Sequence, residues 1–357
     1  ANEGTVLKQQ LDLRTVYRPG ELLEAVPGLV VTQHSGEGKA NQYFLRGFNL
    51  DHGTDLRITV DGMLVNQRSH GHGQGWSDTN FLIPELISSM QYLKGPYYAA
   101  QGDFSSAGAV SLGYVNTLPK GIASYGLGEQ GFMRGLVAKS RKAGDGNILY
   151  ALELLTKDGP WIKHEDFKKF NAVLRYSQDN GPTRFNVTAM GYGGKWNSTD
   201  QIPLRAVASG LIPRLGTVDP SDGGKSHRFS LSGALEHAGR FGKTQLNLYT
   251  LHTNLALFSN FTYFLNDPVN GDQFSQFDKR FQSAMNLNQA WVNKIGGFEV
   301  ENTVGVQFQN DIIDNGLLST KQRQTLSTTR KDHINQNSIG LYYQNSIQWL
   351  EKFRSVT

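Results

Sequence analysis

The chain has no cysteine, and none of its apolar runs approaches the length of a membrane-spanning helix. Without cysteine, disulfide bridges, thiolate zinc sites and cysteine nucleophiles are excluded. Without an apolar run of about 18 residues, any part that crosses a membrane has to be built from strands. Lysine and arginine are scattered and exceed the acidic residues only slightly, 35 against 31, so the sequence predicts no nucleic-acid partner.

Glycine, by contrast, is plentiful at 40 of 357 residues, which is typical of many short strands joined by turns. Residues 1–120 have the pattern of a compact α/β unit. The stretch PGELLEAVPGLVV predicts a helix, a turn and a strand, and LRITVDGMLVN predicts a hairpin at its Asp-Gly pair. IPELISSMQYLKGP predicts a short helix that begins at its proline and runs into a strand.

After residue 120 the pattern changes to repeated alternation of apolar and polar residues. In FEVENTVGVQF, every second residue from Phe298 onward is mainly apolar and the residues between are mainly polar, which predicts a strand with one apolar face. The same pattern recurs in RFNVTAM and RFSLSGAL. It predicts about ten strands, near 121–130, 132–141, 147–156, 168–178, 183–193, 227–238, 244–256, 279–293, 297–311 and 337–349.

The connections between these strands alternate in length. Tight turns such as KAGDG, DNGP, GRFGK and NKIGG alternate with long links near residues 201–225 and 314–336. Such alternation is typical of a bacterial outer-membrane barrel, so we expect the long links outside the cell and the turns at Asp145 and Lys294 in the periplasm. The alternative is a soluble up-and-down barrel or sandwich, but its strands have about 5–6 residues, and several runs here exceed that length.

Five motifs of the first unit carry a family resemblance. LLEAVPGLVV, NQYFLRGF, ITVDGMLVN, PELISSMQYLKGP and GDFSSAGAVSL follow the order and spacing of the plug domain of TonB-dependent outer-membrane receptors, and the chain resembles that family over about residues 17–120. The resemblance implies a plug domain, residues 1–120, inside a transmembrane antiparallel β-barrel of about 22 strands, to which residues 121–357 contribute the first part. Because about ten strands are too few, we expect the chain to stop before the barrel is complete.

The resemblance also implies two partners, the TonB energy-coupling complex and the lipid bilayer. The stretch GTVLKQQ is either the neighbourhood of the TonB box or simply a first strand.

The sequence contains no complete motif of the enzyme classes that its glycine-rich stretches resemble. HSGEGKAN lacks the glycine spacing and the Ser or Thr of a phosphate-binding P-loop, and FSSAG lacks the first glycine of a nucleophile elbow. Asp219 and Asp222 lie among turn-forming residues, which favours turn roles over a calcium site or a glycosidase pair. The sequence therefore predicts that the protein is not an enzyme.

In the resembled family, ligand meets the outward tip of the plug. By motif position, HSGEGKANQ, NLDHGTD and NQRSHGHGQGW form that tip, and they hold four of the nine histidines. Candidate ligand-binding residues are His34, Lys39, Asn41, Asp51, His52, His70, His72, Gln74 and Trp76. Of these, His52, His70 and His72 are candidate metal ligands, because neutral imidazoles on glycine-flanked backbone can converge on a metal. The alternative is that they only make loop hydrogen bonds, with Gly71 and Gly73 present for positive φ.

Other polar and aromatic residues have weaker claims. Tyr97 and Tyr98 could add aromatic surface or pack against the barrel wall, and Arg46 and Arg57 are expected to form buried ion pairs between plug and barrel. If the histidines coordinate a metal, ligand binding should weaken as the pH falls through about 6.5, because protons compete. If they donate hydrogen bonds to an anionic ligand, the trend should reverse.

Together these features predict a TonB-dependent active-transport receptor of the Gram-negative outer membrane. It would import a scarce solute, which by family frequency is an iron-siderophore, with another metal chelate, a cobalamin-like cofactor or a glycan as the alternatives. It would have no covalent cofactor, and any metal would be carried by the ligand. The rivals are a passive porin or a β-rich outer-membrane adhesin, which need no separate α/β domain in the lumen. A soluble metalloenzyme built on the histidines lacks a carboxylate partner in the sequence.

Overall fold

The computed structural model describes residues 2–357. Its N-terminal unit, the plug, holds two small sheets, ordered β1-β7-β8-β5-β6 and β2-β3-β4. Its elements are β1 (Glu3–Leu7), α1 (Lys8–Leu11), the 3-10 helix η1 (Pro19–Ala25), β2 (Leu29–Thr32), β3 (Gln42–Leu45), β4 (Phe48–Asn49), β5 (Leu56–Val60), β6 (Met63–Leu64), η2 (Pro84–Leu86), β7 (Ile87–Leu93), η3 (Ala99–Gln101) and β8 (Gly108–Tyr114). The stretch GTVLKQQ therefore spans strand β1 and helix α1.

The local signals in the plug produce the expected elements. The PGELLEA stretch forms η1 with Pro19 at its first position, although as a 3-10 helix, and Gly28 takes a positive φ of 85° in the turn before β2. Asp61 and Gly62 turn the hairpin between β5 and β6. Strand β5 is buried along its whole length and pairs in parallel with β8, so it forms the centre of the plug core.

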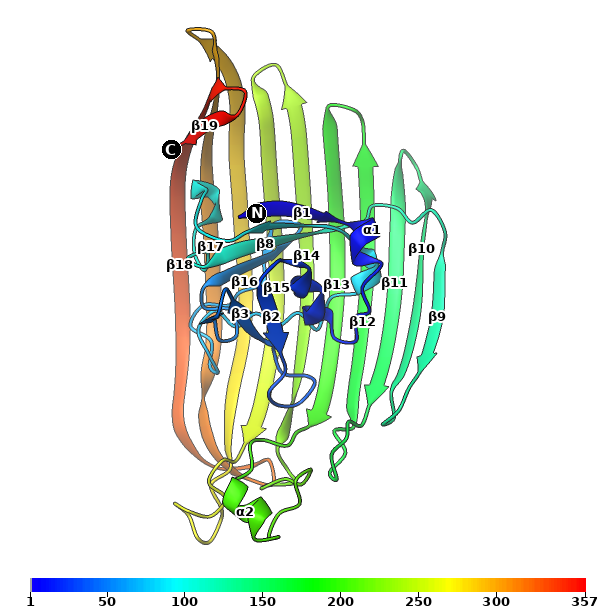
Figure 1. The fold of residues 1–357 in the computed structure, drawn as a ribbon, viewed down its shortest axis with the longest axis vertical. Coiled ribbons are helices and arrows are strands. Elements are labelled where there is room, and N and C mark those ends of the chain that lie inside the picture. Colours follow the sequence, from blue (N-terminus) through cyan, green and yellow to red (C-terminus); the bar gives the residue numbers. More distant parts are fainter. Residues whose placement is uncertain (1) are drawn as a thin grey trace.

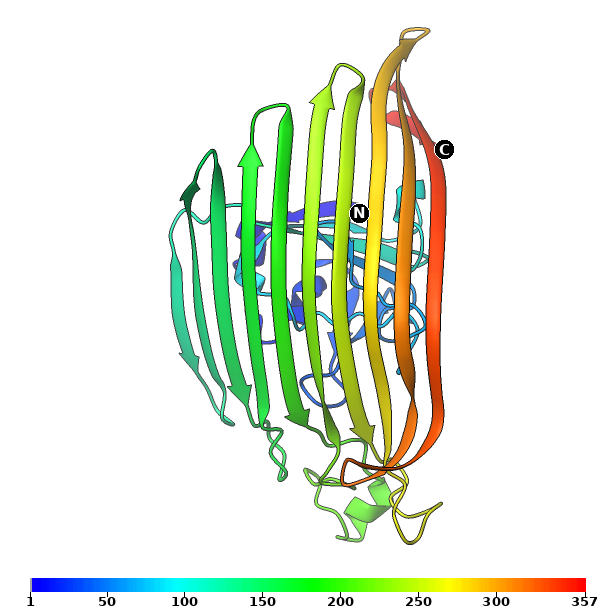
Figure 2. The ribbon, with the colours of Figure 1, turned by 180° about the vertical axis from the view of Figure 1, so that it is seen from behind.

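The rest of the chain forms one antiparallel sheet of eleven strands in sequential order. The strands are β9 (Ile122–Leu127), β10 (Met133–Ala143), β11 (Gly146–Lys157), β12 (Phe167–Asp179), β13 (Thr183–Asn197), β14 (Gly223–Gly239), β15 (Gly242–Ser259), β16 (Phe274–Ile295), β17 (Phe298–Lys321), β18 (Gln324–Leu350) and β19 (Phe353–Val356). Figure 1 shows the plug in front of this sheet, and Figure 2, the view from behind, shows the sheet covering it. We call the plug-facing side of the sheet the inner face.

The two ends of the sheet differ in their connections. Tight turns lie at one end, and the link of residues 198–222, with the short helix α2 (Leu204–Ala208), lies at the other (Figure 1). The expectation of ten strands was one short, because β19 adds an eleventh. The expectation of a long link over residues 314–336 was wrong: β17 and β18 continue through it and turn only at Gln322 and Arg323.

Alternation along the strands separates the inner from the outer face. In β14, Arg228, Ser230 and Ser232 are buried toward the plug, whereas Phe229 and Leu231 are about half exposed, at 54% and 51%. The apolar face thus points outward and the polar face inward, as in a membrane barrel. Among the described residues, no helix combines the length and apolar character needed to cross a membrane.

Ion pairs fasten the plug to the inner face. Arg175 of β12 contacts Asp61 at 2.6 Å, and Arg134 of β10 contacts Glu85 at 2.6 Å. The expectation that Arg46 and Arg57 would form such pairs was wrong. Arg46 is exposed and donates to the Asn2 side chain, because its positive φ of 55° turns it out of the strand. Arg57 is buried and donates to the Asp103 carbonyl oxygen.

Candidate ligand site at the plug apex

Three plug loops, at residues 33–41, 50–55 and 65–77, form what we call the plug apex. They follow β2, β4 and β6, and in Figure 1 the plug extends toward the end of the sheet that carries α2. Gly53 and Gly75 bring two of the loops together. Both have positive φ, and a Cβ on either would lie under 3 Å from the other's carbonyl oxygen, so only glycine fits at this crossing.

Four histidines gather around Trp76 in the plug apex. His52 lies at the centre, with ring centroids 5.3 Å from His34, 5.0 Å from His72 and 5.0 Å from Trp76. His70 stacks on Trp76 at 4.8 Å, with the ring planes 6° apart. The chain places these rings together from three separate loops, which is the convergence that the motif positions predicted.

Hydrogen bonds fix which nitrogen of each central imidazole carries the proton. His52 Nδ1 lies 2.9 Å from the carbonyl oxygen of Asn41, which can only accept, so Nδ1 donates and Nε2 keeps its lone pair. His72 Nδ1 lies 2.7 Å from Gln276 Oε1, and the Gln276 amide is oriented by its Nε2, which donates to the Gly71 carbonyl oxygen. Nε2 of His72 is therefore also an acceptor.

His70 has the opposite tautomer and a different role. Its Nδ1 accepts from the backbone N–H of His72 at 3.2 Å, and its Nε2 faces Asp278 of β16 at 3.9 Å. The side chain is almost fully buried between Trp76 and the inner face. We conclude that His70 packs the loop against the sheet, and that its Nδ1 lone pair is already used by the His72 backbone N–H.

Burial keeps the central imidazoles neutral. Together with the Lys39 ammonium, it lowers the pKa of His52 to about 4 and that of His72 to about 2. Burial also lowers the pKa of His70 to about 3, although Asp278 opposes the shift. At neutral pH, His52 and His72 thus present two lone pairs beside an indole ring.

The remaining candidate residues divide into two groups. Lys39 is buried and its Nζ lies 3.3 Å from His34 Nε2, which places a cation at the edge of the cluster. Asn41 is structural, because its amide donates to Gln33 and its carbonyl oxygen holds His52. Gln74 is exposed and accepts from the Ser69 backbone N–H.

Asp51, with a positive φ of 47°, has its carboxylate 3.7 Å from His52 Nε2. Tyr97 and Tyr98 do not belong to the cluster, because they contact Lys94 and Glu3 near β1. Across residues 2–357, no three His, Asp or Glu side chains are arranged to hold a metal ion by themselves.

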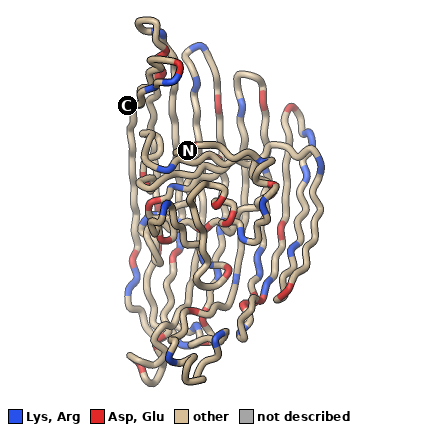
Figure 3. Tube along the Cα trace, in the orientation of Figure 1, with Lys and Arg blue, Asp and Glu red and all other residues tan. Residues whose placement is uncertain are grey.

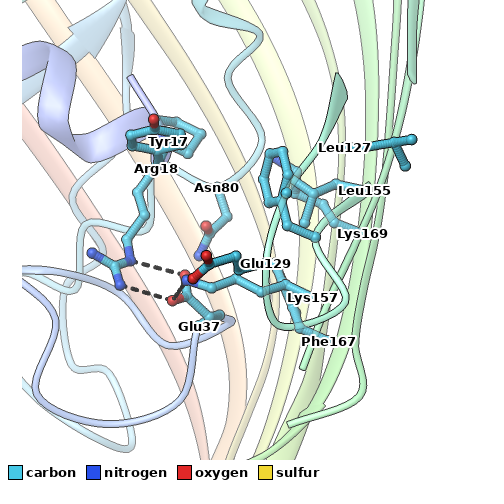
Figure 4. A pocket seen from close by; sticks show the side chains of 13 residues that line it. Tyr17, Arg18, Glu37, Asn80, Leu127, Glu129, Leu155, Lys157, Phe167 and Lys169 are labelled. Carbon is cyan, nitrogen blue, oxygen red and sulfur yellow. Dashed lines mark hydrogen bonds and ion pairs between the residues drawn. The ribbon is translucent and has the colours of Figure 1, made fainter. Parts of the chain in front are cut away.

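A cavity of about 280 Å³ lies beside the apex, between the start of η1 and strands β9–β12 (Figure 4). Glu37 of the plug accepts two hydrogen bonds from Arg18, each 2.8 Å long, and one from Lys157 of β11 at 2.6 Å. Burial raises the pKa of Glu37, but these two cations outweigh it and the net shift is downward. Sequence analysis did not predict the contact between Glu37 and Lys157, since these residues lie 120 positions apart.

A sheet wall whose inner face is covered by an N-terminal plug, with polar loops at the plug tip, is the arrangement found in plugged outer-membrane transporters. Residues 3–109 match the TonB-dependent Receptor Plug Domain family. This match identifies the N-terminal unit as a plug domain of that family, and the predicted fold class is confirmed.

Solved structures share the fold at low sequence identity. The Copper transporter OprC is 15% identical with a TM-score of 0.73, and the match covers 99% of this chain and 53% of that one. The ferric citrate transporter FecA in its unliganded form is 13% identical with a TM-score of 0.76, over 97% and 53%. The siderophore receptor PirA from Acinetobacter baumannii is 15% identical with a TM-score of 0.67, over 98% and 55%. The chain thus spans about half the length of these proteins.

Proposed function

We propose that the protein is an active-transport receptor of the Gram-negative outer membrane that binds a metal chelate at the plug apex. The observation that carries the proposal is the pair of neutral imidazoles of His52 and His72, each with Nε2 unprotonated, beside the Lys39 cation. The two nitrogen lone pairs can complete the coordination of a metal whose other ligands come from the solute. They can instead accept hydrogen bonds that the solute donates.

The charge and composition of the apex favour an anionic chelate over a bare ion. Because the described residues contain no three-ligand cage, a bare ion would be held weakly, whereas a chelate brings its own ligands. Burial lowers the pKa of Lys39, but the carboxylates of Asp200 and Asp51 oppose that shift, and the Lys39 side chain can pair with carboxylate or catecholate groups. Trp76 supplies a flat apolar wall. Among the similar structures are transporters of copper, ferric citrate and siderophores, which are the chemistries to test first.

A passive porin is the weaker alternative. A passive pore needs an open lumen, whereas here the plug packs against the inner face through the ion pairs of Asp61 and Glu85. Energy-coupled rearrangement of the plug, driven by the TonB complex, would be needed to open a path. Strand β1, which lies at the edge of the larger plug sheet (Figure 1), is a segment that an inner-membrane partner could engage.

The test is to replace both acceptors, H52A/H72A, in the full-length receptor. Each lost hydrogen bond should cost about 1 kcal/mol, so the double variant should bind about thirtyfold more weakly. Affinity is measured by calorimetry with ferric citrate, a ferric tris-catecholate and a cupric salt as probes. H237A is the matched control, because His237 lies near a tight turn and its side chain hydrogen-bonds to Thr183.

The pH dependence of ligand affinity distinguishes two roles of His52 and His72: coordination by the neutral rings, and hydrogen bonds donated by the protonated rings. Because the pKa of His52 is about 4 and that of His72 about 2, affinity should stay constant from pH 8 to about 5.5 and fall as the pH approaches 4. Binding that strengthens on acidification would contradict the acceptor role. Unchanged affinity of H52A/H72A for every probe would move the site away from the plug apex.

A further inference from the structure

Three lysines on neighbouring strands point away from the plug. Lys168 of β12, Lys195 of β13 and Lys225 of β14 are exposed, whereas the residue next to each along the strand, Lys169, Trp196 and Gly224, is buried on the inner face. Because side chains alternate between the two faces of a strand, the three lysines lie on the outer face.

The strand register places these lysines in one row. Lys168 is directly opposite Lys195, and Lys195 is directly opposite Lys225. Neighbouring strands are about 4.8 Å apart, so three positive charges lie within about 10 Å of one another. Like charges at directly opposed positions destabilise a sheet unless something neutralises them.

No acidic side chain of the described chain, residues 2–357, pairs with Lys168, Lys195 or Lys225. The other end of the sheet differs, because there Arg184 pairs with Asp179 at 2.9 Å and Lys243 pairs with Glu236 at 2.9 Å. We call Lys168, Lys195 and Lys225 the lysine row. Figure 3 shows blue positions on several neighbouring strands in the half of the sheet nearer the long links.

The lysine row lies at the boundary of the apolar outer surface. Nearer the tight turns, β12 carries Phe170, two residues from Lys168, and β14 carries Phe229, four residues from Lys225; they are 42% and 54% exposed. Strand β16 repeats the arrangement, with Lys279 exposed and Phe281 46% exposed. A cation directly beside an aromatic and apolar band marks the level at which lipid head groups meet acyl chains.

We propose that the lysine row binds the phosphate groups of a phosphorylated glycolipid in the outer leaflet, with the acyl chains lying on the Phe170 and Phe229 side. Three adjacent cations match a head group that carries more than one phosphate, because a single phosphate would leave part of the repulsion within the row uncompensated. Lysine acts here as a point charge for phosphate, and the head group is therefore recognised by charge density. The inference rests on the proposed placement of the sheet in the outer membrane.

The experiment is native mass spectrometry of the full-length receptor in detergent, titrated with diphosphoryl lipid A, its monophosphoryl form and dioleoyl-phosphatidylglycerol. The test variant is K168Q/K195Q/K225Q. The matched control is K139Q/R141Q/K142Q, which removes the same charge from exposed residues of β10 near a tight turn. We expect the test variant to bind diphosphoryl lipid A at least tenfold more weakly, the control to bind it like the wild type, and the wild type to prefer two phosphates to one.

Equal binding by the test variant and the wild type would overturn the proposal, as would wild-type binding of phosphatidylglycerol as tight as that of diphosphoryl lipid A. The affinity of the same variants for the chelate probes separates this inference from the transport function. Because the lysine row lies on the face opposite the plug apex, chelate binding should be unchanged in K168Q/K195Q/K225Q. A protein that binds lipid as expected but no chelate would leave the lysine row supported and the proposed function refuted.

Discussion

At the scale of single residues, Gly71 and Gly73 look equivalent in the sequence but differ in the structure. Neither has a positive φ, so the alternative interpretation, that they are present for backbone conformation, is wrong. A Cβ on Gly71 would lie 2.6 Å from the Phe277 carbonyl oxygen of β16, whereas a Cβ on Gly73 would lie 3.4 Å from its nearest atom, Asp51 Oδ2. Gly71 is therefore required for the close approach of the apex to the sheet.

We predict that G71A loosens the apex and that G73A does not. The added methyl group in G71A meets backbone, which cannot move away as a flexible side chain can, so residues 69–76 must shift from the sheet. Hydrogen exchange of these residues should speed up at least tenfold in G71A and stay within twofold in G73A. Equal protection in both variants would show that the contact at Phe277 yields without cost.

The residues of the plug apex were predictable only in part. Their loops were assigned correctly because turn formers and strand signals are local, and four histidines in three loops drew attention to the apex. Gln276 and Asp278, which orient His72 and His70, were not found, since each lies about 205 residues away from its partner in an ordinary strand pattern. Long-range pairing of this kind leaves no periodic trace in a single sequence.

At the scale of elements, the link between β11 and β12 contains a buried acid. Glu165 is 4% exposed, accepts from Trp161 Nε1 at 3.1 Å, and its carbonyl oxygen accepts from the Asn197 backbone N–H at 2.6 Å. Burial and the nearby Glu37 carboxylate raise the pKa of Glu165 to about 7. The folded link thus binds the proton more tightly than the unfolded one does.

From this pKa we predict that residues 158–166 open more readily at alkaline pH. The stabilising contribution of the Glu165 proton is complete below the unfolded value of 4.5 and is lost as the pH rises through about 7. Hydrogen exchange at Glu165 and Asn197, corrected for intrinsic rates, should show lower protection at pH 8 than at pH 5.5. E165Q should remove most of that difference, and a pH effect that persists in full would assign it to other groups.

The element that sequence analysis missed was the far end of the β17–β18 hairpin. Residues 324–331 are exposed on both faces, so they show no alternation of apolar and polar residues, and turn-like composition dominated the prediction. Strand pairing continues there through backbone hydrogen bonds, with two register shifts near Leu317 and Ser319. Backbone pairing without a buried face is invisible to a hydropathy pattern.

At the scale of the whole molecule, the absence of cysteine offers a direct test of sidedness. We predict that an impermeant maleimide labels R214C on intact cells and does not label D145C. Arg214 is exposed in the link that carries α2, and Asp145 is exposed in a tight turn. Both sites react equally well only when the cells are lysed. Labelling of D145C alone on intact cells would reverse the orientation of the sheet.

The choice of Arg214 follows from the structure, since Asp222 in the same link is fully buried. The general course of the sheet was foreseeable because most strands carry their own alternation and several tight turns contain a glycine. The burial of individual loop residues could not be predicted. Arg323 reaches from the β17–β18 turn to the backbone of Ser221 and Asp222 and covers that part of the link.

The orientation of β1 has a mechanical consequence. Its five residues pair with β7, from Glu3 opposite Leu93 to Leu7 opposite Ser89, and in Figure 1 it lies across the direction of the barrel strands. A tension applied at the N-terminal end of β1, along the strands of the large sheet, would act across β1 and not along it. It would load the Glu3–Leu93 pair first and the other four residue pairs one after another. Strand β1 would therefore separate from β7 pair by pair under a small force. The same tension directed along β1 would load all five pairs at once and meet far greater resistance.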